Sequence, residues 1–187
     1  MTEDPERHLI ERAPRDPDAF RSLYRAYFPR VYAYVAYRVG RAWDAEDVTT
    51  EVFIRVLRGL PQFEYRGQGA FAAWVFRIAY TEVCGFFRQQ RDETTRFDEL
   101  PDIRSDEPSP DQMLLLRERF ARLRAHIAEL SPRRQEIVTL RSFGGLRNQE
   151  IATILGLDER TVASHLSRAL ADLQRSYENE LDKDNQP

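Results

Sequence analysis

Apolar residues in the first half of the chain recur every three or four positions, which is the spacing of one face of an α-helix. One such face runs over residues 20–35 and contains Pro29. Because proline lacks a backbone N–H and collides with the preceding turn, we expect Pro29 to break or kink this helix. Two more apolar stripes, at about residues 44–60 and 70–86, predict further helices. The first half is therefore predicted to be a bundle of three or four helices.

Capping and breaking residues mark the ends of several helices. Asp44, with Asp47 three positions later, is typical of an N-terminal cap, and Gly59 with Pro61 ends that helix. Similar signals predict four later helices. Two span residues 112–130 and 148–155, a third begins at a cap at Ser131 and ends at the glycines at 144–145, and a fourth begins at a cap at Asp158 and continues past 173. No stretch alternates strictly between apolar and polar residues, so the predicted fold is all-α.

Residues 92–111 separate the two helical halves and differ from both in composition. They carry eight acidic and two basic side chains together with three prolines, which suits an extended, solvated tether. The flanking segments 1–91 and 112–187 carry net charges of only +2 and +1. We therefore expect two small helical domains, residues 1–91 and 112–187, joined by an extended acidic linker at 92–111.

Residues 149–166 carry the strongest local signal. Ala152 leaves room where two helices cross, Gly156 can adopt the positive φ of a tight turn, and Val162 reaches back into a core. This spacing favours a DNA-binding helix-turn-helix, with an ordinary helical hairpin as the alternative. The outer face of its second helix would present Arg160, Thr161, Ser164, His165 and Arg168.

The chemical types of these five side chains suggest which part of the DNA each would contact. Arg160, Thr161 and Arg168 suit contacts to phosphates, while Ser164 and His165 suit contacts to base edges. A solvated surface histidine is the alternative for His165. The near-neutral charge of this half predicts modest affinity for DNA when it acts alone.

Composition argues against several other classes of protein. The net charge is −3, no apolar run approaches the roughly 18 residues of a membrane span, and the first residues do not resemble a signal peptide. We therefore expect a cytoplasmic protein without membrane insertion. Cys84 is the single cysteine and is expected to be a core thiol, and the three histidines lack metal-ligand spacing. Because no catalytic motif is present either, we expect no enzyme, catalytic residue, metal or cofactor.

The helix DAEDVTTEVFIR at 44–55, the segment FAAWVFRIA at 71–79, the acidic linker and the helix-turn-helix occur in that order. Together, over about residues 15–177, they resemble a bacterial sigma factor of the extracytoplasmic-function group in the sigma-70 superfamily. The resemblance implies a non-enzymatic promoter-recognition subunit of RNA polymerase, with region 2 in the first domain and region 4 in the second. It also implies three partners: core RNA polymerase through its β′ clamp helices and β flap, promoter DNA, and an anti-sigma factor.

The same resemblance assigns roles to individual positions. Region 4 would bind duplex −35 DNA, and the β′ clamp helices would dock on a polar face made by Asp47, Thr50, Glu51 and Arg55, for which a solvated helix face is the alternative. Unpaired −10 bases would meet aromatic and polar side chains, which suit single strands: Tyr65, Arg66, Gln68, Arg77, Tyr80, Thr81 and Arg88. Trp74 lies in the apolar stripe and is expected in the core. The promoter elements lie about 50 to 70 Å apart, and 20 extended linker residues reach about 66 to 72 Å.

Several positions depart from the usual pattern of the family. Thr81 replaces a common Asn, and Glu82 would repel phosphate, so Glu82 is expected to point elsewhere or melting to use other contacts. Thr50 replaces a common Gln, which weakens that polymerase contact. Arg147 replaces a frequent capping Ser, so Asn148 is expected to cap that helix. A stand-alone helix-turn-helix repressor or activator with a ligand-sensing or dimerising bundle is the alternative function.

Overall fold

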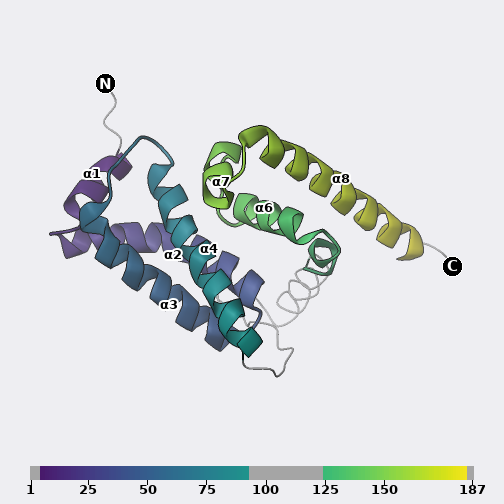
Figure 1. Cartoon of the computed structure of the whole chain (residues 1–187), viewed down its shortest axis with the longest axis horizontal. Coiled ribbons are helices and arrows are strands. Elements are labelled where there is room, and N and C mark those ends of the chain that lie inside the picture. The colour runs from purple at the N-terminus through teal and green to yellow at the C-terminus, as the bar shows by residue number, and fades with distance from the viewer. Residues whose placement is uncertain (1–4, 93–123, 185–187) are drawn as a thin grey trace.

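The computed structural model describes residues 5–92 and 124–184, with side chains described for 5–90 and 124–180. Within these ranges the chain is helical and contains no strand, which confirms the all-α prediction. Four helices and a short 3₁₀ turn form the first module, and the described helices of the second half form a module beside it (Figure 1). The acidic linker predicted at 92–111 lies outside the described residues except for Asp92, which ends α4. The domain boundaries therefore stay a prediction.

The first two helices are α1, Pro5–Arg12, and α2, Pro17–Val39. The sequence pattern missed α1. Asp16 caps α2 by accepting hydrogen bonds from the backbone N–H groups of Asp18 and Ala19. The helix runs through Pro29, so the predicted break is wrong. Pro29 is exposed, and on that side of a helix water can satisfy the carbonyl that loses its partner.

The third helix, α3, spans Ala42–Gly59 and ends in the 3₁₀ turn η1, Leu60–Gln62. Arg41 rather than Asp44 occupies its N-cap position, and no side-chain capping bond is made there. Asp44 lies in the first turn instead, where a carboxylate is favoured by the helix dipole. The predicted end at Gly59 is confirmed, and the predicted cap at Asp44 is wrong.

The fourth helix, α4, spans Ala70–Asp92 and passes through the centre of the first module. Its segment Ala70–Gln90 is long and apolar enough to cross a membrane by length and composition alone. Val75, Phe76, Ala79 and Val83 are fully buried, however, and pack against α2 and α3. Trp74 is half-buried between Phe63 and Phe71, beside the core rather than in its centre.

The second module contains α6, Pro132–Ser142, α7, Asn148–Leu155, and α8, Glu159–Asp184. Of the helix predicted over 112–130, residues 124–128 are described as helical, and residues 112–123 lie outside the described ranges. Ser131 takes the N-cap position of α6 as predicted, but without a side-chain capping bond. At α7 the predicted cap is wrong, because Arg147 is the N-cap and Asn148 the first helical residue. The Glu150 carboxylate accepts a hydrogen bond from the Arg147 backbone N–H at 2.7 Å.

The two modules pack directly against each other. One apolar cluster continues from Val31, Val35 and Phe76 of the first module to Ile137 and Ile151 of the second. In Figure 1, α6 and α7 lie beside the bundle while α8 extends away from it. The structure therefore adds a close contact between the modules that the tethered arrangement predicted from the sequence did not include.

Candidate nucleic-acid interface

The turn between α7 and α8 has the geometry of a helix-turn-helix. Gly156 adopts the left-handed conformation, with φ of 64° and ψ of 39°. The Leu157 N–H donates to the carbonyl of Ala152 at 3.0 Å, which closes the end of α7 in the manner of a Schellman motif. Ala152 and Val162 are buried where the two helices meet. The three residues singled out in the sequence thus take the predicted places.

Asp158 caps α8, as predicted. Its carboxylate accepts hydrogen bonds from the backbone N–H of Thr161 at 2.8 Å and from the Thr161 hydroxyl at 2.6 Å. These bonds, first the one from the hydroxyl, lower the pKa of the Asp158 carboxyl below its ordinary value. The hydroxyl of Thr161 is therefore engaged within the protein, and Thr161 serves the cap in this conformation.

The other candidate −35 residues lie on successive turns of α8. Arg160, Ser164 and Arg168 are exposed. His165 is half-buried, and its Nδ1 is buried with no hydrogen-bond partner among the described residues. Two guanidinium groups, a hydroxyl and an imidazole thus share the first three turns of α8, and both arginines are exposed where they can reach phosphates.

The candidate −10 residues form two groups. The first group belongs to the loop 65–69, which precedes α4. Arg66 is exposed and pairs with Glu64 at 3.0 Å. The Tyr65 ring is half-buried, with the Arg7 guanidinium 5.9 Å from its centroid. Gln68 is exposed, but its carbonyl oxygen accepts a hydrogen bond from Arg147 of the second module at 2.6 Å.

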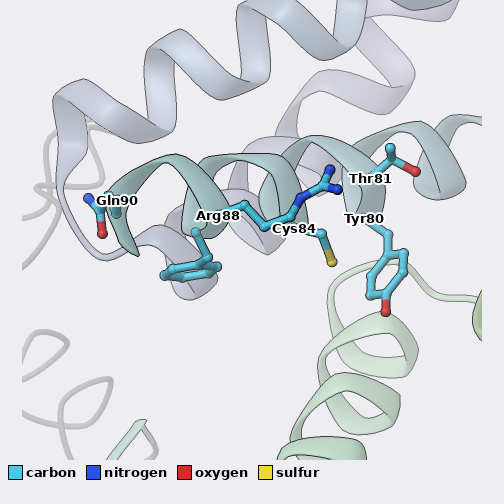
Figure 2. A pocket seen from close by; sticks show the side chains of 6 residues that line it. Tyr80, Thr81, Cys84, Arg88 and Gln90 are labelled. Atoms are coloured by element: carbon cyan, nitrogen blue, oxygen red, sulfur yellow. The ribbon is translucent and has the colours of Figure 1, made fainter. Parts of the chain in front are cut away.

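The second group lies along α4. Arg77 is exposed, and Tyr80, Thr81 and Arg88 line an open pocket of about 680 Å³ together with Cys84, Phe87 and Gln90 (Figure 2). Burial, then the neighbouring Cys84 thiol and the Glu136 carboxylate, raises the pKa of the Tyr80 phenol. Since Arg88 is 18 residues beyond the start of α4, the candidate −10 residues extend over about 27 Å of this helix from the end of the loop.

The four residues predicted to meet the polymerase lie on α3. Asp47, Thr50 and Arg55 are exposed, and Glu51 is half-buried. Asp47, Glu51 and Arg55 line a polar groove between α3 and α4 that includes Glu82. The Arg55 guanidinium pairs with both Glu51 and Glu82 at 3.0 Å. Glu82 therefore points toward α3, into a groove that Thr81 and Arg88 also line.

Sequence reasoning missed some residues of these surfaces. Cys84 is half-buried at the pocket rather than in the core, and Phe87 is exposed beside it. Both follow Tyr80 at helical spacing, which is a signal that the pattern did contain. The contact of Arg147 with Gln68 joins residues 79 positions apart, and no local sequence pattern predicts it.

Comparison with known proteins places both halves of the chain. Residues 23–93 match the sequence model of sigma-70 region 2, and residues 120–173 match that of sigma-70, region 4. The RNA polymerase sigma-H factor of Pseudomonas aeruginosa is 31% identical over 179 residues, which cover 90% of this chain and 92% of that protein. The ECF RNA polymerase sigma factor BldN of Streptomyces coelicolor is 38% identical over 171 residues, or 89% of this chain, and the match spans only 64% of BldN.

A solved structure also shares the fold. CnrH in complex with the cytosolic domain of CnrY superposes with a TM-score of 0.72 at 21% identity, covering 94% of this chain and 99% of that one. At this level of identity the similarity concerns the arrangement of the helices alone.

Proposed function

Since the chain belongs to the extracytoplasmic-function group of the sigma-70 family of RNA polymerase sigma factors, we propose that it directs core RNA polymerase to promoters by contacting two DNA elements at once. The observation that carries the proposal is the order of the two matched regions, with a helix-turn-helix in the second. When two modules bind DNA together, each can have a low affinity for its own element, and the whole chain still binds tightly only where both elements are present.

The N-terminal turns of α8 are proposed to enter the major groove of the −35 element. Arg160 and Arg168 contact phosphates and fix the register of the helix, while Ser164 and His165 meet base edges. Because Nδ1 of His165 is buried, Nε2 is the ring nitrogen left for a base. Two exposed arginines neutralise few phosphates, so this module binds DNA firmly only when the polymerase supplies the remaining contacts.

The loop 65–69 and the exposed face of α4 are proposed to hold the unpaired −10 strand. Arg66, Gln68 and Tyr65 receive a base at the loop, and Arg77, Tyr80, Thr81 and Arg88 follow the strand along α4. Stacking on an aromatic ring is worth about 1 to 3 kcal/mol per base and tolerates any sequence. A strand that follows about 27 Å of helix accounts for two groups of residues rather than one pocket.

The polar face of α3 is proposed to dock on the β′ clamp helices. Asp47, Thr50, Glu51 and Arg55 are presented by one rigid helix, and the groove beside them holds both signs of charge. Charges arranged in this way set the register of a helical partner. The β flap is the expected partner of the second module.

In this role the chain catalyses no reaction and acts in the cytoplasm, where the polymerase meets the chromosome. An anti-sigma factor is proposed to control it. CnrH, which shares the fold, was solved with a second protein, the cytosolic domain of CnrY.

Transcription in vitro tests the proposal. The purified chain is mixed with core polymerase, and a library of genomic fragments serves as template. We expect transcripts that depend on the chain and that start downstream of a shared pair of sequence elements. Binding of the chain alone to two-fold symmetric duplex sites, with no effect on the polymerase, would instead identify the stand-alone regulator considered as the alternative.

A further inference from the structure

The short helix α1 lies outside the part of the chain that matches sigma-70 region 2. The match begins at residue 23, whereas α1 spans Pro5–Arg12. In space, α1 lies at the end of the first module where the chain passes from α3 to α4, which is the end that carries the loop 65–69 (Figure 1). A segment that the family model does not include therefore borders a candidate −10 contact.

Apolar and polar contacts fix α1 against the bundle. Ile10 and Ala13 are buried in the apolar cluster of the first module, and Leu9 packs on it. The hydroxyl of Tyr27, a buried residue of α2, donates a hydrogen bond to the Glu6 carboxylate. Burial, then this carboxylate, raises the pKa of the Tyr27 phenol, so the hydroxyl keeps its proton and can donate. These contacts define both the position of α1 and its rotation about its own axis.

The rotation of α1 places Arg7, the residue after Glu6, at the loop. The Arg7 guanidinium carbon lies 5.9 Å from the centre of the Tyr65 ring, which is within the range of a cation–π interaction. One turn along α1, the Glu11 carboxylate accepts a hydrogen bond from Nε of Arg7 at 2.7 Å and holds the guanidinium in place. Glu11, Arg7 and Tyr65 thus form a chain of contacts from α1 to the loop.

An aromatic cluster holds the two ends of this loop. The Tyr27 ring meets Phe71 edge-on with the ring centroids 5.1 Å apart, and Phe71 meets Phe63 in the same way at 5.4 Å. Phe63 and Phe71 flank the loop in the sequence. Because its ends are packed, the loop is held at a fixed place on the bundle, and Arg7 acts on the Tyr65 ring between those ends.

The contacts of Arg7 add little to the stability of the fold. The Arg7 and Glu11 side chains are 61% and 54% exposed, and an exposed ion pair is weak. Tyr65, by contrast, is half-buried, and its ring must have one orientation if an unpaired base is to stack on it. A side chain that is already oriented before its ligand arrives loses less conformational entropy on binding. Arg7 therefore fits a positioning role better than a structural one.

We propose that Arg7 is a positioning residue for −10 recognition, which holds the Tyr65 ring in the orientation that receives an unpaired base. The inference rests on the proposed function of the loop 65–69. It makes α1 part of the promoter-binding surface, as the element that carries Arg7. The loop's own cation, Arg66, pairs with Glu64 at 3.0 Å and so serves a different contact.

NMR of the free chain tests the contact without polymerase or DNA. We expect a nuclear Overhauser effect between the side-chain methylene protons of Arg7 and the ring protons of Tyr65 in the parent chain, and its absence overturns the contact. An aromatic ring also shifts the resonances of protons that lie over its face. Tyr65→Leu should therefore move the Arg7 methylene resonances toward those of an unstructured arginine, whereas Tyr65→Phe, which keeps the ring, should leave them near the parent values. Resonances that are the same in all three chains overturn the contact as well.

Run-off transcription with core polymerase tests the positioning role, on templates that differ only in the −10 element. Arg7→Met keeps a long side chain and removes the charge, and we expect it to lower transcription about two- to fivefold, which is the effect of one exposed cation–π contact. The factor should depend on the −10 sequence. Arg15→Met, at an exposed arginine just after α1, removes the same charge and is the matched control, expected to keep the parent activity on every template. Equal losses for the two variants would mean a general effect of charge and overturn the proposal.

A double-mutant cycle shows whether Arg7 acts through Tyr65. In a chain with Tyr65→Phe the ring is present, and Arg7→Met is expected to lower transcription by the same factor as in the parent. In a chain with Tyr65→Leu, whose own activity is the reference, Arg7→Met is expected to change transcription by less than about 1.5-fold. The same factor in all three chains would show that the two residues act independently, and it overturns the positioning role. Equal midpoints of urea unfolding for Arg7→Met and Arg15→Met verify that stability is not the cause.

Failure of this proposal and failure of the proposed function give different results. If the parent chain directs transcription and Arg7→Met matches it on every −10 template, the positioning role is wrong and the sigma function stands. If the parent chain directs no transcription by core polymerase on any template, the proposed function is wrong, and the role of Arg7 in −10 recognition is overturned with it. The NMR measurements use the free chain, so they report on the contact in either case.

Discussion

Arg55 of α3 and Glu82 of α4 form an ion pair, with 3.0 Å between Nε and Oε1. The pair explains a departure from the family pattern, in which an acidic residue stands close to the predicted path of DNA. Glu82 faces the groove between the two helices, and its side chain is only 14% exposed. Thr81 lines the same groove, so the Arg55 guanidinium, which pairs with the carboxylate, offsets the negative charge beside a strand at Thr81.

The buried position of Glu82 predicts a dependence of stability on pH. Burial raises the pKa of this carboxyl above the ordinary value of 4.5, an effect that Arg55 opposes and Glu51 reinforces. The folded chain thus binds this proton more tightly than the unfolded chain, so stability is lost as pH rises from 4.5 through the raised pKa.

Urea unfolding at a series of pH values measures this effect. Glu82→Gln is expected to gain stability relative to the parent chain as pH rises through that window. Glu64→Gln, at an exposed residue that pairs with Arg66, is the control and is expected to differ little at any pH. A parallel pH dependence of the parent chain and Glu82→Gln would contradict the assignment.

Arg55 is predicted to matter for the polymerase more than for the fold. Its guanidinium is 52% exposed, so its pair with Glu51 contributes only about 0.3 to 0.5 kcal/mol to stability. Arg55→Ala leaves two carboxylates without their cation at the proposed interface, and we expect its affinity for core polymerase to fall at least threefold. Arg58→Ala, at an exposed residue one turn on, should keep the parent affinity in a competition assay with labelled core enzyme.

The turn of the helix-turn-helix is predicted to require glycine at position 156 because of its backbone conformation and not because a side chain would collide with a neighbour. No atom of the described residues lies within 4 Å of a Cβ built there, so the cost of a side chain is the left-handed conformation itself. Gly156→Ala is expected to lose about 1 kcal/mol of unfolding free energy. Gly156→Asn is expected to lose less, because asparagine tolerates this conformation. Equal midpoints in urea for all three chains would show that the turn relaxes into another form.

The success of the helix-turn-helix prediction has a physical reason. Ala152, Gly156 and Val162 lie close together in the sequence, around the junction of α7 and α8. The junction needs a small side chain, a positive φ and a branched apolar side chain, and few residue types can meet each of these needs. The span of α7, Asn148–Leu155, was also predicted, although its N-cap was placed one residue too late. The Pro29 prediction failed because the cost of an interior proline depends on which face of the helix it occupies, and that face is set by tertiary packing.

The contact between the modules had no local signal. Glu136 lies on α6 among residues that read as an ordinary amphipathic helix, and its partner Tyr34 is 102 positions away. A sequence pattern identifies Tyr34 as a core residue of α2, but not which part of the chain covers its hydroxyl. The same holds for Arg147, whose departure from the family pattern is visible in the sequence while its contact with Gln68 is not.

The division of work on α8 predicts two different phenotypes in transcription. His165 is proposed to meet a base edge, so His165→Ala should reduce transcription by an amount that depends on the −35 sequence; one good base contact is worth about 1 to 3 kcal/mol of discrimination. Arg168 is proposed to contact phosphate, so Arg168→Ala should weaken transcription from every promoter by a similar factor and lower the salt dependence of binding.

Arg175 is exposed on the same helix two turns beyond Arg168 and pairs with Asp172, and Arg175→Ala is the matched control. The measurement is run-off transcription with core polymerase from a set of templates that differ only in the −35 element. Equal losses for His165→Ala on every template would remove His165 from base recognition and assign it, like Arg168, to positioning the helix.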